Sequence, residues 1–304
     1  MPEPATSRRQ FATTPHLHIA YEMGAPADGP PVLLLHGWPD DVRTYDKVAP
    51  ALQAAGFRTI APWLRGFGET RFLSALAMRS GEMVAMAQDA LDLADALALK
   101  RFAVVGHDWG ARIAYAMAIL WPERVTRICA MSVGWQPGEL ATPGFAQVRK
   151  YWYQWFMATA RGKEAVAKDG KGFARIMWET WAPPGWFSEA EFETTAASFA
   201  NPDWTAVTLH SYQVRWGEAA KDPRYRALDE RAHAAKSISV PTLMIQGGAD
   251  GVTLASSTAG KDKYCRRLCA ARARRRRPLP DARSTGRRQQ TAARLPEIKK
   301  GRPR

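Results

Sequence analysis

Apolar and polar positions follow two alternating rhythms along most of the chain. Short apolar runs bounded by turn residues predict five β-strands, at residues 31–35, 58–62, 103–106, 125–132 and 242–246. Between the earlier runs, apolar side chains recur at helical spacing over residues 45–55, 82–99 and 110–121. Strands that alternate with helices in this way predict an α/β fold with a mostly parallel, doubly wound sheet.

This rhythm breaks between about Gly134 and Asp229, in a segment rich in Trp, Tyr and Phe that looks helical. Two breaks divide it, at Pro183-Pro184-Gly185 and Asn201-Pro202-Asp203. A helical insertion between two strands of one sheet predicts a lid over the C-terminal edge of that sheet, where doubly wound folds bind ligands. We therefore expect a core formed by residues 1–133 and 230–264, with residues 134–229 as its lid.

The last 40 residues have a different character, because hydrophobic periodicity ends and arginine dominates from Cys265 onward. The chain has a net charge of +14, yet residues 1–264 carry 28 basic and 27 acidic side chains, while residues 265–304 carry 15 and 2. We expect this tail to be disordered and the last strand and helix of the core to be lost. A nucleic-acid binder acting through Arg274–Arg277 is the alternative of another class. We do not expect it, because the other 264 residues show no basic face.

Bulk features point to an intracellular protein without a metal. The N-terminus is polar and lacks the apolar region of a secretory signal. No apolar stretch approaches the roughly 18 residues of a membrane span. Three cysteines, at positions 129, 265 and 269, are too few and too poorly spaced for a disulfide framework or a zinc site. A reducing cytoplasm, with no membrane attachment, is the expected location.

The segment Gly106-His107-Asp108-Trp109-Gly110 carries the clearest chemistry, because it follows a predicted strand and opens a predicted helix. This is the setting of a nucleophile elbow, with Asp108 in the place that serine hydrolases give to serine. A carboxylate there attacks an electrophilic carbon and forms an alkyl ester, which water then cleaves. The alternative is an ordinary turn in which Asp108 only caps the helix.

With this elbow and the turn His36-Gly37-Trp38-Pro39 after the strand at 31–35, the chain resembles the epoxide hydrolase and haloalkane dehalogenase branch of the α/β hydrolases. The resemblance covers roughly residues 15–264. It implies an α/β-hydrolase fold and hydrolysis without cofactor or metal. It also implies that the backbone N–H groups of Trp38 and Trp109 form an oxyanion hole. The histidine of the turn and the Arg65-Gly66-Phe67-Gly68 segment are expected to be scaffold.

Two lid tyrosines favour one member of this branch. Tyr153 and Tyr212 resemble the pair of phenols that donate hydrogen bonds to an epoxide oxygen in epoxide hydrolases. The alternative is aromatic packing. Haloalkane dehalogenases need halide-binding N–H donors such as Trp109 supplies, so a haloalkane remains the alternative substrate. Fluoroacetate dehalogenases usually carry arginine after the nucleophile, and Trp109 argues against that subgroup.

The triad acid and base should follow late strands. Asp250, after the predicted strand at 242–246, fits the acid, which orients and stabilises the base. The base should be a histidine beyond Asp250, and none is present. The histidines are His16, His18, His36, His107, His210 and His233.

The genetic code offers an explanation for the missing base. Read one nucleotide later, the codons for residues 268–285 permit a β-strand followed by Gly-His-Phe-Pro, the catalytic-histidine motif of the family. The histidine would come from the codon of Pro278. Our hypothesis is a frameshift near Lys263–Cys265, genuine or from sequencing. The chain as written is then expected to lack turnover.

Overall fold

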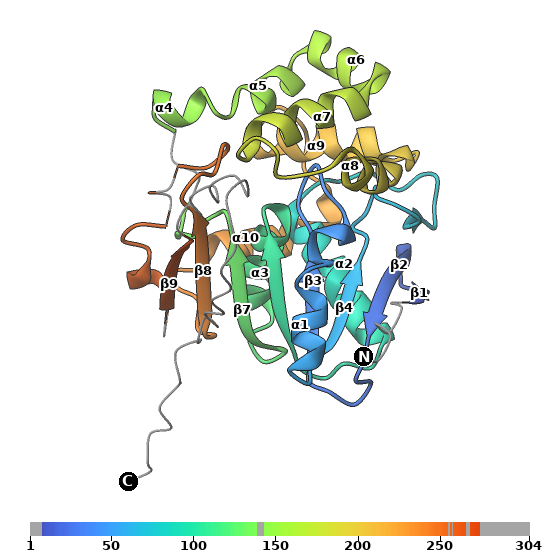
Figure 1. The fold of residues 1–304 in the computed structure, drawn as a ribbon, viewed down its shortest axis with the longest axis vertical. Helices are drawn as coiled ribbons and strands as arrows, with labels where there is room; N and C mark the ends of the chain where they lie inside the picture. Colours follow the sequence, from blue (N-terminus) through green and yellow to red (C-terminus); the bar gives the residue numbers. More distant parts are fainter. Residues whose placement is uncertain (1–7, 139–142, 255, 257, 266–267, 274–304) are drawn as a thin grey trace, which may run out of the picture. The chain divides into compact units, whose positions relative to one another are not determined.

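The structure, a computed structural model, describes residues 8–138, 143–254, 256, 258–265 and 268–273. Its centre is a mixed sheet with strand order β1-β2-β4-β3-β6-β7-β8-β9, and the short β5 pairs with β2 (Figure 1). From β4 to β9 the paired strands are parallel, whereas β1 and β2 are antiparallel to their neighbours. The strands are β1 (Arg8–Thr13), β2 (Leu17–Gly24), β3 (Pro31–Leu35), β4 (Arg58–Pro62), β5 (Arg71–Phe72), β6 (Phe102–His107), β7 (Val125–Met131), β8 (Thr242–Gly247) and β9 (Leu268–Ala273).

The predicted parallel strands are confirmed. Those at 31–35 and 58–62 have the same bounds as β3 and β4, and the other three agree with β6, β7 and β8 to within one residue at each end. The hydrophobic pattern did not reveal β1 and β2. These strands form the antiparallel edge of the sheet, and the end of β2 is only partly buried, so apolar residues do not run through it.

Helices cover both faces of this sheet, with α1 on one face and α2, α3 and α10 on the other (Figure 1). The prediction of helices over 45–55, 82–99 and 110–121 is confirmed, with shorter bounds. The helices are α1 (Ala49–Ala54), α2 (Met83–Ala96), α3 (Trp109–Leu120) and α10 (Arg226–Ala234). The predicted division between lid and core at residue 229 falls inside α10, which packs against α2 and α3.

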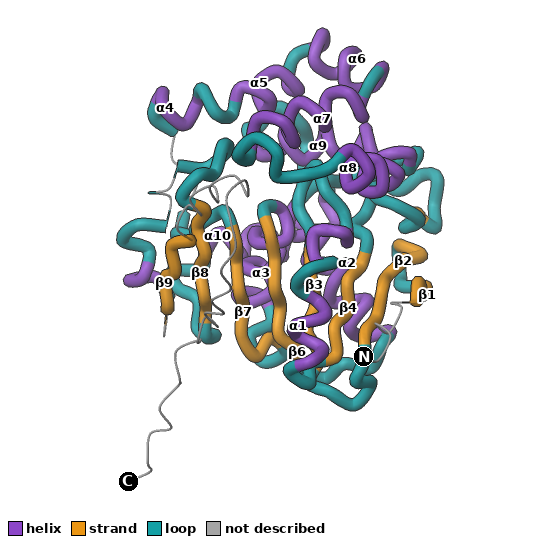
Figure 2. Tube along the Cα trace, in the orientation of Figure 1, coloured by secondary structure: helices purple, strands orange, loops and turns teal. Residues whose placement is uncertain are grey.

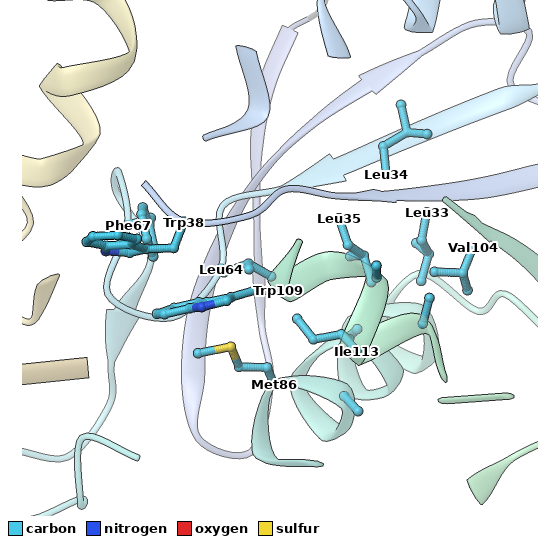
Figure 3. Packing of buried hydrophobic residues seen from close by; sticks show 14 of the residues in the cluster. Leu33, Leu34, Leu35, Trp38, Leu64, Phe67, Met86, Val104, Trp109 and Ile113 are labelled. Atoms are coloured by element: carbon cyan, nitrogen blue, oxygen red, sulfur yellow. The ribbon is translucent and has the colours of Figure 1, made fainter. Parts of the chain in front are cut away.

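Burial explains why the central strands read as continuous apolar runs. The side chains of Leu33, Leu34 and Leu35 in β3 are fully buried, because helices cover both faces of the sheet there. Figure 3 shows leucines of β3 with Val104 of β6 and Ile113 of α3 in one core. This core fixes the ends of β3 and β6, from which the loops of the candidate site begin.

The lid is helical, as predicted, and lies over the C-terminal edge of the parallel strands (Figure 2). Its six helices occupy the chain between β7 and α10, with short 3-10 turns beside them. They are α4 (Phe145–Val148), α5 (Trp152–Ala158), α6 (Ala160–Lys168), α7 (Gly170–Trp181), α8 (Glu189–Ala196) and α9 (Trp204–Arg215). The 3-10 helices of the chain are η1 (Val42–Tyr45), η2 (Ala197–Ala200), η3 (Pro223–Tyr225) and η4 (Asp262–Tyr264).

Tryptophan N–H groups join the lid to the loops of the core. Trp178 of α7 donates to the carbonyl of Pro39 at 2.7 Å, and Trp38 donates to the hydroxyl of Thr208 in α9 at 3.1 Å. Because these indoles are buried, each N–H needs an acceptor, and the bonds fix how the lid sits on the core. Much of the Trp-rich composition of the lid therefore serves packing.

The expectation that the last strand is lost is wrong. Residues 268–273 form β9, which pairs in parallel with β8. A strand at the edge of a sheet is held by backbone hydrogen bonds, which need no amphipathic side-chain pattern. The rest of the predicted tail, from residue 274 onward, lies outside the described residues. The predicted loss of the last helix and the codon of Pro278 lie outside the described residues.

Candidate active site

Asp108 lies on a sharp turn between β6 and α3. Its backbone has φ 52° and ψ −107°, a conformation that residues other than glycine rarely adopt. The flanking glycines permit this turn: a Cβ on Gly106 would lie 2.0 Å from the carbonyl oxygen of Gly110, and one on Gly110 would lie 1.8 Å from that of Leu35. The strain and the two close approaches are those of a nucleophile elbow.

The loop after β3 packs directly on this elbow. The backbone N–H of Trp38 donates to Oδ1 of Asp108 at 3.1 Å. A Cβ on Gly37 would lie 2.6 Å from Cβ of Asp108, so only glycine permits this approach. One of the two predicted oxyanion donors therefore contacts the carboxylate of Asp108. For Trp109, the structure instead gives a side-chain bond, from its indole N–H to the hydroxyl of Tyr212 at 3.2 Å.

The two lid tyrosines lie together next to this loop. Tyr153 of α5 and Tyr212 of α9 are both buried, and their ring centroids are 5.3 Å apart in an edge-to-face arrangement. The ring of Trp38 stacks on Tyr153 and meets Tyr212 edge-on. Burial raises the pKa of both phenols, and the charge of Asp108 raises it further. Both therefore keep their protons at neutral pH.

Both phenol oxygens already accept a hydrogen bond. Gln154 donates to the hydroxyl of Tyr153 at 2.8 Å, and the indole of Trp109 donates to that of Tyr212. A phenol that accepts one bond can still donate its own proton. Each phenol therefore still has its own O–H group to donate.

His36 supports the loop and is poorly suited to act as a base. Its Nδ1 lies 2.9 Å from the carbonyl oxygen of Gly37, and its Nε2 accepts from the backbone N–H of Leu64 at 3.1 Å. Burial lowers the pKa of His36 to about 4, so the ring is neutral. The imidazole thus links the loops after β3 and β4.

Arg65 is likewise engaged within the core. Its guanidinium donates to both carboxylate oxygens of Asp89, at 2.6 and 2.7 Å, and also to Ser80, Ala85 and Tyr225. The side chain of Arg65 is almost fully buried. A buried ion pair with its remaining donors satisfied is a structural feature, which agrees with the scaffold expected for this segment.

Asp250 lies in the loop after β8, at the same edge of the sheet as Asp108. Its Oδ1 accepts from the backbone N–H groups of Val252 and Thr253, at 2.8 and 2.9 Å, and its Oδ2 accepts from Gln246 at 3.1 Å. The carboxylate is therefore held by its own loop. In the part of the chain that the structure describes, no histidine bonds to Asp250.

Two of the described histidines form hydrogen bonds away from Asp250. His210 accepts from the N–H of Gly81 and lies beside the carbonyl of Ala220, while His233 pairs with Asp229. Nδ1 of His107 is buried without a hydrogen-bond partner.

Sequence reasoning missed Asp40, a second carboxyl group close to the elbow. Burial raises the pKa of Asp40 to about 7, and the nearby charges of Asp41 and Asp108 raise it as well. The available signal was its place, since Asp40 and Asp41 directly follow the turn at the C-terminal end of β3. Acidic residues at such an edge are candidates for functional groups.

The described residues lack both a helix that could span a membrane and a cluster that could hold a metal ion. None of their helices is long and apolar enough to cross a membrane. They also contain no group of three or more His, Cys, Asp or Glu side chains arranged to hold a metal ion.

Comparisons with known proteins agree with this geometry. Residues 30–270 match the family model described as the alpha/beta hydrolase fold. Epoxide hydrolase A from Mycobacterium tuberculosis is 26% identical over 269 residues, which cover 76% of this chain and 78% of that protein. An epoxide hydrolase from Caballeronia sordidicola is 36% identical over 117 residues, or 38% of this chain. The matches span only about a third to a half of the first two curated relatives, 34% and 45% of their lengths.

A solved structure extends the likeness to most of the fold. A Klebsiella pneumoniae protein provisionally named an epoxide hydrolase superposes with a TM-score of 0.80 and 36% identity, covering 87% of this chain and 88% of that one. The likeness thus covers most of both chains. The chain belongs to the α/β-hydrolase fold family and is similar to its epoxide hydrolases.

Proposed function

We propose that this chain is built to open an epoxide with Asp108 as the nucleophile. The observation that carries the proposal is the pair of buried phenols, Tyr153 and Tyr212, beside an aspartate on a strained elbow. Attack of an Asp108 oxygen on a ring carbon breaks one carbon–oxygen bond of the epoxide. The freed alkoxide takes a proton from a lid tyrosine, and an alkyl ester of Asp108 remains.

Cleavage of that ester requires a second set of groups. Water must lose a proton to a base as it attacks the ester carbonyl, and the N–H of Trp38 would stabilise the resulting oxyanion together with that of Trp109. Asp250 is proposed to orient the base. Since no histidine bonds to Asp250 among the described residues, we propose that the chain as written stops at the ester.

A haloalkane is the runner-up substrate, because displacement of a halide would use the same nucleophile. The buried indole of Trp109 supports that alternative, since its N–H could hold a leaving halide. In this chain the same N–H bonds to the hydroxyl of Tyr212 at 3.2 Å. The bond orients a phenol rather than leaving the indole free, which favours the epoxide.

Mass spectrometry of the intact chain tests the first step. After incubation with styrene oxide, we expect one adduct with the full mass of the epoxide, located on the peptide that contains Asp108. The variant Asp108→Asn should give none. One equivalent of halide from a haloalkane, with no epoxide adduct, would reverse the choice of substrate. Modification of Asp108→Asn at the same rate would refute Asp108 as the nucleophile.

The origin of the missing base is a separate proposal. We infer that a frameshift near Lys263–Cys265 has replaced a segment that encodes Gly-His-Phe-Pro. Sequencing the gene tests it. A reading frame shifted by one nucleotide that contains this motif is expected, and its absence would end the hypothesis.

A further inference from the structure

A cavity of about 490 Å³ lies behind the two residues that link the elbow to the lid. Trp109 and Tyr212, which are hydrogen-bonded to each other, form part of its wall. Helix α3 adds Arg112, helix α9 adds Arg215, and the segment after β7 adds Trp135. The cavity therefore adjoins the phenol of Tyr212, which we propose as a proton donor to the epoxide oxygen.

Two arginines in this cavity lack acidic partners. Nε of Arg112 and Nε of Arg215 are both buried without a hydrogen-bond partner, and neither arginine forms an ion pair with a described residue. Arg215 contacts the rings of Tyr151 and Trp216 instead. Aromatic faces stabilise a guanidinium but do not use its in-plane N–H donors.

Arg112 also makes it less favourable for Arg215 to carry its positive charge. Burial lowers the pKa of Arg215 to about 10, and the neighbouring charge of Arg112 lowers it too. Lys261, which also lines the cavity, has its pKa lowered by burial and by Arg112. Arg112, Arg215 and Lys261 thus line one cavity, where a bound anion would stabilise their charges.

The acidic residues that line the cavity do not neutralise these cations. Glu82 accepts from the backbone N–H of Asp222 at 2.7 Å. Asp229 pairs with Lys221 at 2.5 Å and with His233 at 3.2 Å. Their charges are directed to other partners, so the positive charge of the two arginines remains available.

We propose that Arg112 and Arg215 bind the carboxylate of a substrate whose aromatic or aliphatic body lies along the cavity wall. Guanidinium groups match carboxylates with paired hydrogen bonds, and the indoles and aliphatic side chains of the wall suit an apolar body. The inference rests on the proposed function and narrows its substrate class to epoxides that carry a carboxylate.

Binding of an unreactive carboxylate tests the pocket without chemistry. Isothermal titration of the full chain should show that 3-phenylpropionate binds at least tenfold more tightly than the uncharged 3-phenylpropionamide. Arg112→Gln and Arg215→Gln should each weaken binding of the acid at least tenfold. Arg161→Gln is the matched control, because Arg161 is exposed on α6 and lies outside the cavity.

The variants should fold, because each removes an unpaired buried charge. Their thermal midpoints are expected to equal or exceed that of the parent, and addition of 3-phenylpropionate should raise the midpoint of the parent alone. Equal binding of acid and amide, or acid binding that survives both arginine substitutions, would overturn the proposal.

A second measurement separates this inference from the proposed function. Alkylation of Asp108 by 3-phenylglycidate should be at least tenfold faster than by its methyl ester, and Arg112→Gln should remove the difference. Acid binding without any alkylation would support the carboxylate-binding pocket and refute the epoxide chemistry. Alkylation at equal rates by the acid and the ester, without acid binding, would refute the pocket alone.

Discussion

The candidate site has a nucleophile side, around Asp108, and a base side, around Asp250. The described residues differ in how many of the expected groups they supply on each side. On the nucleophile side, Asp108 accepts a hydrogen bond from the backbone N–H of Trp38, and two buried tyrosines pack against the ring of Trp38. On the base side, the described residues that donate to the carboxylate of Asp250 are Gln246, Val252 and Thr253. Under the proposed function, ester formation and ester hydrolysis would depend on different stretches of the chain, and the described residues would supply the groups for the first step but no base for the second.

The largest effect should come from supplying the base. Restoring the frame so that Gly-His-Phe-Pro follows β9 is expected to raise turnover of styrene oxide by about 10⁴–10⁶-fold over the chain as written, because water then has a proton acceptor. Diol released per enzyme over many turnovers measures it. The restored chain with that histidine changed to glutamine is the control. Repeated turnover by the present chain would contradict the contrast between the two sides.

Removing a phenol should impair the nucleophile side alone. Tyr153→Phe and Tyr212→Phe are each expected to slow alkylation of Asp108 by about 10²-fold, since a proton donor to the developing alkoxide is lost. Both tyrosines are protonated at neutral pH, because burial and the charge of Asp108 raise their pKa. Adduct formation over time, followed by mass spectrometry, gives the rates. Tyr21→Phe, on β2, is the matched control, and an unchanged rate in both lid variants would assign the pair to packing.

Features that depend on local sequence patterns could be predicted from the sequence, and features that depend on tertiary structure could not. The parallel strands and the elbow at Asp108 were predictable because they depend on local patterns, namely apolar runs and closely spaced glycines. The lid tyrosines needed a family resemblance. Arg112 and Arg215 were not predictable, since the burial of their Nε atoms without partners depends on the tertiary structure that brings both side chains to one cavity. The strand β9 was missed because edge pairing depends on the backbone rather than on side chains.

A smaller effect concerns stability near the elbow. The pKa of Asp40 is raised from 3.8 to about 7, mainly by burial, so the folded chain holds a proton that the unfolded chain releases above about pH 4. Stability should therefore fall as pH rises from about 4 to 7. In Asp40→Asn this loss is removed, and the variant should be more stable than the parent by about 2 kcal/mol at pH 8, with little difference at pH 4.

Urea unfolding of both chains at pH 4 and pH 8 measures this difference. Asp28→Asn is the matched control, because Asp28 is exposed. Parallel stability curves for the parent and Asp40→Asn across that range would show that Asp40 ionises normally.

The smallest effect on alkylation is expected for a substitution on the base side, at Asp250. Asp250→Asn in the present chain should change the rate of Asp108 alkylation by less than about threefold, because Asp250 has no part in the first step. An asparagine oxygen can still accept from the N–H groups of Val252 and Thr253, so the loop should keep its shape. In the restored chain, the same substitution should strongly slow diol release while alkylation stays fast. A large loss of alkylation in the present chain would mean that both sides act in one step, and the division drawn from Asp108 and Asp250 would be wrong.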